Sequence, residues 1–214
     1  MRKKITHFGY KGSYLFSEEE MYPRKKVSQS EFEESISGVS MQIVNACYDG
    51  FRECLDLSQT HRGAARMRNF KPTNLNSLMA EKLMESFQDS SGIDSDGRFY
   101  LSIGGGKLFL KKVDSSFKHK NIQTKNVGMY NKQLSASNED SSPITFIGYQ
   151  VDESYTNITG VYAIHYENGD ISWVSDVEYI ASKSNEAIPL NYLKDNDVDE
   201  VSVAVKGGKQ RKAE

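Results

Sequence analysis

The sequence predicts an α+β fold in which a helical N-terminal half packs on a mainly antiparallel sheet formed by residues ~98–205. Up to about residue 90 the apolar residues recur at helical spacing, and from residue 98 they alternate with polar residues, as in half-buried strands. We therefore predict one domain, residues 1–205, with a helical part at ~28–90 and a β-rich part at ~98–205. Residues 206–214 are polar and basic, which predicts a flexible basic tail.

Two capping signals mark the start of the helical part. Residues 1–27 mix aromatic side chains with glycines and lysines, as in a short strand or an irregular arm. Ser28 and Glu31 have the spacing of a capping box, and so do Ser30 and Glu33. Either pair would begin the first helix directly after this arm.

Two apolar stripes predict the helices. The first stripe has spacings of three, four and seven and comprises Phe32, Ile36, Ile43, Cys47, Phe51 and Cys54. Gly38 and Gly50 weaken this helix and are the positions at which it would divide into two. The second stripe recurs every four residues and comprises Leu75, Met79, Leu83 and Phe87. We expect the second helix to start near Asn74, after Pro72 and Thr73.

Alternating apolar residues predict the strands of the second half. Residues 98–103 and 107–113 are expected to form a hairpin around a glycine turn. A short helix is expected at 124–135, a further strand at 144–151 and a last strand around 201–205. These elements make the second half mostly β.

An Asn-Gly pair at 168–169 gives the best hairpin signal in the sequence. A two-residue type I′ turn needs positive φ at both central positions, which asparagine and glycine tolerate. Such a turn would place Tyr166 opposite Ile171. It would also place Ile164 opposite Trp173.

The bulk composition is that of a soluble globular protein. A hydrophobic fraction of 37% and an aromatic fraction of 11% support a packed core and argue against disorder. No stretch approaches the roughly 20 apolar residues that span a bilayer, and no apolar segment follows the basic N-terminus as in a signal peptide. Cys47 and Cys54 would lie about 10 Å apart on one helix, too far for a disulfide. We therefore expect reduced thiols, a cytoplasmic location and no membrane partner.

Several segments suggest ligand-binding loops but lack residues that such loops need. The Gly-Gly-Gly-Lys run at 104–107 has neither the earlier glycine nor the following Ser or Thr of a phosphate loop. Residues 94–97 do not continue with the ligand spacing of a calcium loop. The histidines are scattered, without the paired spacing typical of zinc sites. We therefore expect no cofactor and no metal.

Charge is distributed unevenly along a chain whose formal net charge is −2. Residues 107–132 hold seven lysines against one acid, and residues 61–71 hold three arginines and a lysine with no acid. Residues 133–200 hold thirteen acids against two lysines. The near-neutral total therefore conceals a polarised molecule.

The two basic segments predict a nucleic-acid-binding surface. Fixed positive charge gains free energy by displacing counterions from a phosphate backbone. Flat side chains beside cations, such as Phe70 near Arg68, add stacking on unpaired bases. RNA or single-stranded DNA is favoured over duplex because the sequence has no helix-turn-helix or zinc-finger pattern. The predicted contact residues are Arg62, Arg66, Arg68, Lys71, Lys111, Lys112, Lys118, Lys120 and Lys125.

His119 is the candidate catalytic residue. It stands between Lys118 and Lys120, whose like charge lowers the proton affinity of the imidazole, so a neutral general base near pH 7 is expected. A metal-independent ribonuclease needs such a base together with a cation and a grip on phosphate. The hypothesis therefore extends to a nuclease of toxin or phage-defence type.

Other functions fit the same residues. The basic and acidic segments could pair inside the fold or across a homodimer, and the two lysines at 111–112 could protect an edge strand from aggregation. The first alternative is therefore a non-catalytic protein–protein interaction module with a charge-polarised surface. The second is a small-molecule enzyme, because residues that converge only in three dimensions leave no local motif.

Overall fold

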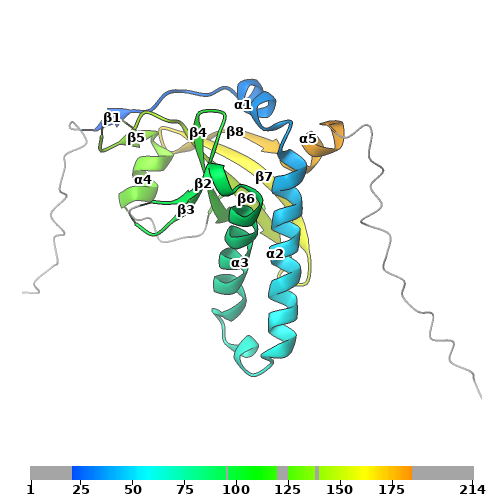
Figure 1. The fold of residues 1–214 in the computed structure, drawn as a ribbon. Helices are drawn as coiled ribbons and strands as arrows, with labels where there is room; N and C mark the ends of the chain where they lie inside the picture. The colour runs from blue at the N-terminus through cyan, green and yellow to red at the C-terminus, as the bar shows by residue number, and fades with distance from the viewer. Residues whose placement is uncertain (1–20, 95, 120–124, 138–139, 185–214) are drawn as a thin grey trace, which may run out of the picture. The chain divides into compact units, whose positions relative to one another are not determined.

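The protein is described by a computed structural model over residues 21–94, 96–119, 125–137 and 140–184. Over these residues the chain forms five α-helices, a mixed sheet of six strands and an antiparallel sheet of two strands (Figure 1). Most helical residues precede the main strands, so the predicted α+β fold is confirmed. The predicted strand at 201–205 and the predicted tail at 206–214 lie outside the described residues.

The helices and strands have the following bounds. The helices are α1 (Gln29–Ile36), α2 (Ser40–Thr60), α3 (Phe70–Ser86), α4 (Lys125–Asn131) and α5 (Val177–Ser184), with short 3-10 helices at Ala64–Arg66 and Gln88–Ser90. The strands are β1 (Tyr22–Pro23), β2 (Ser91–Ile93), β3 (Phe99–Ile103), β4 (Gly106–Lys112), β5 (Leu134–Ser135), β6 (Ile144–Val151), β7 (Ile158–Glu167) and β8 (Asp170–Asp176).

The six-stranded sheet has the order β2-β3-β4-β6-β7-β8. Neighbouring strands are antiparallel except β4 and β6, which run parallel. The parallel pair arises because the chain passes through α4 and β5 between these two strands. The sheet is therefore mainly antiparallel, as predicted, with one parallel pair that no local pattern indicates.

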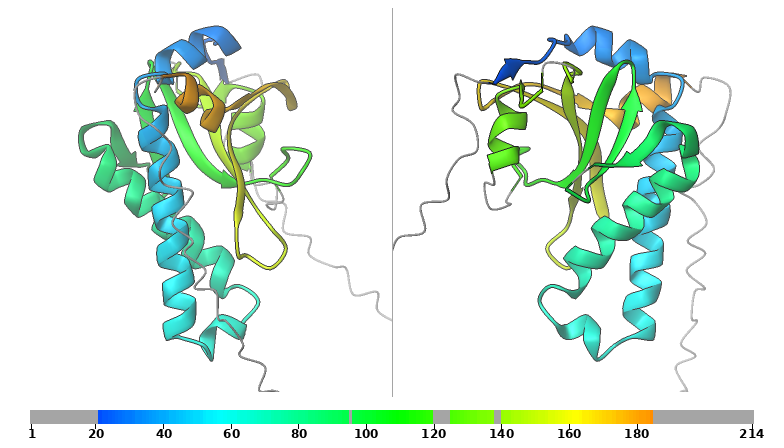
Figure 2. Two further views of the ribbon diagram at one scale, coloured as in Figure 1. Left: turned by 90° about the vertical axis from the view of Figure 1, so that its right-hand side faces the viewer. Right: turned by 60° about the vertical axis from the view of Figure 1, so that its left-hand side comes forward.

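The two faces of this sheet are covered differently. Helices α1, α2, α3 and α5 pack on one face, where their apolar residues join those of the sheet in one buried cluster (Figure 2). The opposite face carries a second, largely aromatic cluster that includes Phe109, Phe146 and Tyr166. Tyr130 of α4 and Phe117 pack against this second cluster.

The capping box of Ser28 and Glu31 begins α1, as predicted. The Glu31 amide donates to Ser28 Oγ, and Glu31 Oε2 accepts from the Ser28 amide at 2.9 Å. The alternative capping residue, Glu33, instead accepts from the hydroxyl of Ser175 on β8 at 2.8 Å. Glu33 therefore joins α1 to the sheet rather than capping it.

The two glycines expected to weaken the first helix have different roles. Residues 37–39 form a turn between α1 and α2, so the helix divides at Gly38. Gly50 lies inside an unbroken α2, where α3 approaches so closely that a Cβ on Gly50 would be 2.6 Å from the Met79 Cα. The sequence shows that residue 50 is a glycine, but it does not show that a neighbouring helix leaves no room for a side chain there.

Helix α3 begins earlier than predicted. It starts at Phe70, so Pro72 lies inside the first turn, where a backbone N–H has no acceptor in the helix. Helices α2 and α3 lie side by side as a helical hairpin, and their connection, residues 61–69, is at the end away from the sheet (Figures 1 and 2). The basic segment at residues 61–71 therefore lies at the end of a helical hairpin that projects from the sheet.

The β7–β8 hairpin confirms one predicted pair and corrects the other. Both central residues of the turn have positive φ, and Tyr166 is opposite Ile171. A bulge in β8, where Ser172 is the extra residue, then shifts the ladder by one position. Trp173 therefore faces His165, and the prediction that it faces Ile164 is wrong. A turn type sets the register only as far as the first bulge.

The sequence patterns do not predict three short elements. Strand β2 follows α3 in a segment rich in turn residues, and α5 follows β8 directly. Strand β5 pairs with β1 and lies within the range 124–135 predicted as a helix, so that helix is shorter than predicted and ends at Asn131. Arg24 secures the β1–β5 sheet, because its buried guanidinium donates to the carbonyls of Leu134, Asp140 and Ser142.

Candidate functional site

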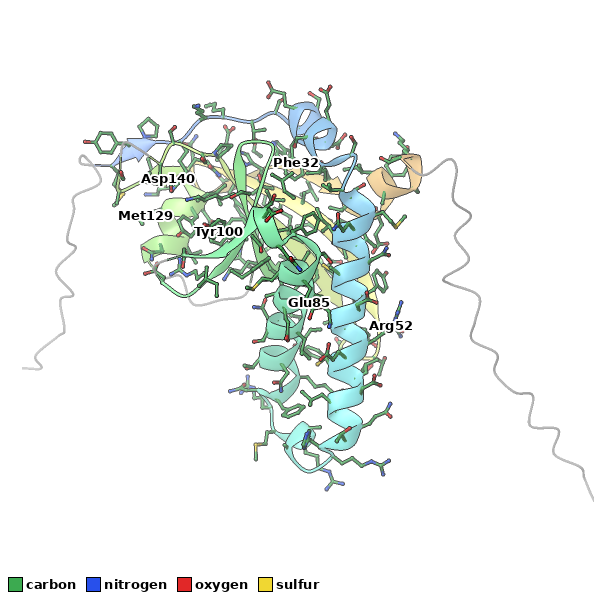
Figure 3. All side chains as sticks on the ribbon, viewed as in Figure 1. Phe32, Arg52, Glu85, Tyr100, Met129 and Asp140 are labelled. Atoms are coloured by element: carbon green, nitrogen blue, oxygen red, sulfur yellow. The ribbon has the colours of Figure 1, made fainter. Side chains whose placement is uncertain are left out.

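The tip of the α2–α3 hairpin carries three arginines, Arg62, Arg66 and Arg68, which we call the arginine tip. All three are exposed, and none forms an ion pair with another described residue. Met67, between two of them, has 69% of its surface exposed. Side chains of this connection project from the end of the hairpin (Figure 3). The arginine tip therefore concentrates positive charge that no acidic side chain among the described residues pairs with.

Lys71 and Lys112, from different basic segments, contact the same loop. Lys71 Nζ donates to the Ser154 carbonyl at 3.0 Å. Lys112 Nζ donates to the Tyr155 hydroxyl at 2.6 Å and lies 4.0 Å from the centroid of that ring. The β6–β7 loop thus joins the two segments at one point. It also carries two acidic residues, at 152 and 153.

Lys111 is a half-buried cation on β4. Alternation along the strand places it on the aromatic face with Phe109. Burial lowers the pKa of its ammonium, and the positive charge of Arg98 lowers it further. Arg98 pairs with Asp96 at 3.2 Å and donates to the Tyr130 hydroxyl at 3.3 Å. Lys111 itself has no ion pair with another described residue.

Lys111 and Arg98 also line a groove of about 750 Å³. Its walls are residues 76–85 of α3, the start of β3 and residues 109–111 of β4, and we call it the α3 groove. Among the predicted contact residues that the structure describes, Lys111 is the one that lines it. In this groove Lys111 lies near residues of α3 and β3, which no sequence motif connects with it.

The other lysines of the second basic segment are dispersed. Lys107 pairs at 3.0 Å with Asp140, a carboxylate that it shares with Arg24. Lys118 is exposed in the segment after β4. Lys120 lies outside the described residues, and so does the side chain of Lys125. The described lysines of residues 107–132 therefore lie in separate places and do not form one continuous basic strip.

His119 is enclosed by aromatic rings on the second face of the sheet. Its ring centroid lies 5.4 Å from that of Phe146 and 5.3 Å from that of Tyr166. Its Nε2 is 3.5 Å from Asn131 Nδ2, and its buried Nδ1 has no hydrogen-bond partner among the described residues. Burial lowers the pKa of His119, and the positive charge of Lys111 lowers it further.

The direction of this pKa change agrees with the sequence prediction, but its cause is different. The sequence points to Lys118 and Lys120 as the cations that act on His119, whereas the structure identifies burial and Lys111. The chain turns back after β4, so that His119 pairs with Val113. The cation that acts on His119 is therefore Lys111, eight positions away in the sequence, rather than an adjacent lysine.

Sequence reasoning misses Arg98 and Tyr130. They come from the residue before β3 and from α4, so no local spacing connects them. The available signal for Arg98 is its place between a turn glycine and a strand, where side chains often border a binding site.

No protein-family model matches the chain, and no curated protein or solved structure matches it significantly. Within the described ranges, no helix is both long enough and apolar enough to cross a bilayer. The same ranges contain no group of three or more His, Cys, Asp or Glu side chains placed to hold a metal ion. Function must therefore be inferred from geometry and charge.

Proposed function

We propose that the protein binds single-stranded nucleic acid, either RNA or single-stranded DNA, through the arginine tip. The supporting observation is that Arg62, Arg66 and Arg68 are exposed together without an ion pair among the described residues. Arginine suits phosphate because its planar guanidinium donates to two oxygens at once. A phosphate backbone would supply the negative charge that the described fold does not.

The free energy of this contact would be mainly electrostatic. Each phosphate contact releases condensed counterions, so the logarithm of the affinity falls with the logarithm of salt concentration by about 0.7 per contact on a single strand. Contacts by all members of the arginine tip would together give a slope of about −2. Lys71 would add less, because the Ser154 carbonyl already accepts from its ammonium.

The shape of the tip favours an unpaired strand. It is a short connection between two helices, not a helix presented along its length as in major-groove readers. His61 is exposed and Phe70 partly exposed beside the arginines, and both offer flat rings to unstacked bases.

The test is binding of a short labelled RNA, the matching single-stranded DNA and their duplex at about 50 and about 200 mM salt. Wild-type protein is expected to bind the single strands more tightly than the duplex and to weaken steeply with salt. A variant with Arg62→Gln, Arg66→Gln and Arg68→Gln is expected to lose most of this affinity and most of the salt dependence.

The matched control carries Lys25→Gln, Lys26→Gln and Lys183→Gln, which remove the same charge from exposed positions away from the tip. This control is expected to bind like the wild type. If both triple variants weakened binding equally, the effect would come from net charge and the proposed site would be refuted.

We extend this proposal to metal-independent cleavage of the bound strand at His119, of toxin or phage-defence type. The lowered pKa of His119 favours a neutral imidazole at pH 7, which can act as a general base. Lys111, whose charge acts on His119, would be the accompanying cation. The test is cleavage of labelled RNA in the presence of a chelator. Absence of cleavage by the wild type, or undiminished cleavage by His119→Asn, would refute this extension.

Met67 favours a second function, the docking of an acidic protein partner on the same tip. Its side chain is 69% exposed between arginines, and such a partner would cover it while pairing with the cations. Met67→Gln would then weaken the protein complex and leave the salt dependence of nucleic-acid binding unchanged. This comparison separates the two functions.

A further inference from the structure

The α3 groove has the volume of a small-molecule site, about 750 Å³. It forms because β4 is longer than its partner: the β3–β4 ladder ends at the Tyr100–Phe109 pair, whereas β4 continues to Lys112. Helix α3 lies beside this end of β4 and supplies the second wall, which includes Glu85 (Figure 3). The recess is therefore built by backbone elements of different length.

Opposite charges line the two walls of the groove. Arg98 and Lys111 lie on the sheet side, and Glu81 and Glu85 lie on α3. Glu85 is paired with a lysine of its own helix, and Arg98 is paired with Asp96. Lys111 and Glu81 have no ion pair with another described residue, although both line the same groove. Two unmatched charges of opposite sign are thus available to one ligand.

The two cations on the sheet side disfavour each other. Lys111 is half-buried, and the charge of Arg98 adds to the burial that lowers the pKa of its ammonium. An anion bound between them would remove this repulsion and accept hydrogen bonds from both. A phosphate group provides several charged oxygens for this purpose.

Apolar side chains border the charged groups. Ile93 has 59% of its surface exposed and Met84 has 36%, while Phe99 is partly exposed at the start of β3. All three line the α3 groove. A planar base can lie against such a surface and shield it from water.

We propose that the α3 groove binds a ribonucleoside phosphate, either as a free nucleotide or as the terminal nucleotide of an RNA. The phosphate contacts Arg98 and Lys111, the ribose hydroxyls donate to the Glu81 carboxylate, and the base lies against Phe99 and Ile93. A carboxylate that accepts from a ribose hydroxyl is a common means of holding a nucleotide. The 2′-hydroxyl would also distinguish this ligand from its deoxy form.

This site is separate from the arginine tip and does not require nucleic acid to bind there. Its residues come from α3, β4, the end of β2 and the start of β3, whereas the tip lies in the 61–69 connection. Loss of either site by mutation is therefore expected to leave binding at the other intact.

The test is a titration of isotope-labelled protein with each common ribonucleoside 5′-monophosphate and its 2′-deoxy counterpart, followed by backbone resonances. At least one ribonucleotide is expected to shift Ala80, Phe99 and Lys111 saturably. The deoxy form of that nucleotide is expected to bind about tenfold more weakly, since a carboxylate would be left without its donor. Lys111→Gln and Glu81→Gln are each expected to weaken binding about tenfold.

The matched controls are Lys25→Gln and Glu34→Gln, which neutralise exposed residues outside the groove. Both are expected to bind the nucleotide like the wild type, and unchanged spectra of all variants without ligand establish that they fold. The proposal is overturned if no ribonucleotide shifts the groove resonances, if ribose and deoxyribose forms bind equally, or if Lys111→Gln binds as well as Lys25→Gln.

A short RNA with a terminal phosphate, added as competitor, distinguishes the two sources of the ligand. Displacement of the nucleotide with the same groove shifts identifies an RNA end, and shifts confined to the hairpin connection identify a free nucleotide. The arginine-tip variant is expected to bind the nucleotide normally. Failure at the groove is thereby distinguishable from failure of nucleic-acid binding at the tip.

Discussion

Gly50 of α2 faces the backbone of Met79 on α3 so closely that an added Cβ would lie 2.6 Å from the Met79 Cα. Gly50→Ala is therefore expected to force the two helices apart. Overpacking of this kind costs about 1–3 kcal/mol, and the gain of about 1 kcal/mol in helix propensity offsets part of this cost. We expect a net loss of up to about 2 kcal/mol in the free energy of unfolding, measured by urea denaturation.

Gly38 provides the matched control, because a Cβ there would meet no atom within 4 Å and its φ is not in the left-handed region. Gly38→Ala is expected to leave stability unchanged or to raise it by about 0.5 kcal/mol. A loss at Gly38 as large as that at Gly50 would mean that helix packing is not the cause.

Arg24 is expected to contribute strongly to stability. Its side chain is buried, it donates to backbone carbonyls and to Asp140, and that carboxylate also pairs with Lys107. Arg24→Gln leaves these carbonyls without donors, and we expect a loss of about 2–3 kcal/mol, since Asp140 is partly exposed and the ion pair is partly screened. Lys25→Gln, at the exposed next position, is the control and should change stability by less than about 0.5 kcal/mol.

His165 is expected to make stability depend on pH. It is fully buried, stacks on Trp173 with ring centroids 5.0 Å apart, and has Nε2 3.8 Å from the Glu167 carboxylate. Burial lowers the pKa of His165 below its ordinary 6.5, and the Ile144 carbonyl and Glu167 oppose this only in part. The unfolded chain therefore takes up a proton more readily than the folded protein. Stability is fully present above the unfolded pKa and is lost as pH falls from there toward the folded pKa.

The measurement is the free energy of unfolding of wild type and His165→Gln between about pH 7 and about pH 5. Other titrating groups, including His119 and Glu178, are present in both proteins, so the difference between the curves isolates His165. The wild type is expected to lose more stability on acidification than the variant. Parallel curves would contradict this assignment.

Asp152 is expected to order the β6–β7 loop. Its carboxylate accepts from the amides of Thr156 and Asn157 and from the hydroxyl of Ser154, and these bonds hold the pKa of Asp152 well below its usual range. Asp152→Asn is expected to speed hydrogen exchange at the 156 and 157 amides. Glu153→Gln, at the exposed neighbouring position, should leave these rates unchanged. Equal protection in both variants would show that the carboxylate does not hold the loop.

The local features of the fold could be predicted because they depend on neighbours in the sequence. The capping box at Ser28 and Glu31 needs only two residues three positions apart, and the Asn-Gly turn needs only its own φ angles. The register beyond that turn could not be predicted. A bulge moves Trp173 opposite His165, and its position depends on how both strands pack against the rest of the sheet.

The candidate site was predictable to a smaller extent. The exposed charge of the arginine tip follows from a basic segment with no acids. The neighbours of Lys111 and His119 do not, because they come from α3, α4 and β3. Adjacent lysines such as Lys111 and Lys112 look equivalent in sequence, yet they point to opposite faces of β4 and meet different partners.

The sequence by itself determined the α+β class, the main helices and hairpins, and the segregation of positive charge into two stretches of chain. Only the tertiary structure decided which of those cations form an ion pair, which stay exposed, and which line the α3 groove. The physical reason is the distance along the chain over which each interaction acts. Helical and strand periodicity arise between residues a few positions apart, whereas the energy of a charge depends on burial and on the groups around it, which long-range strand pairing brings together.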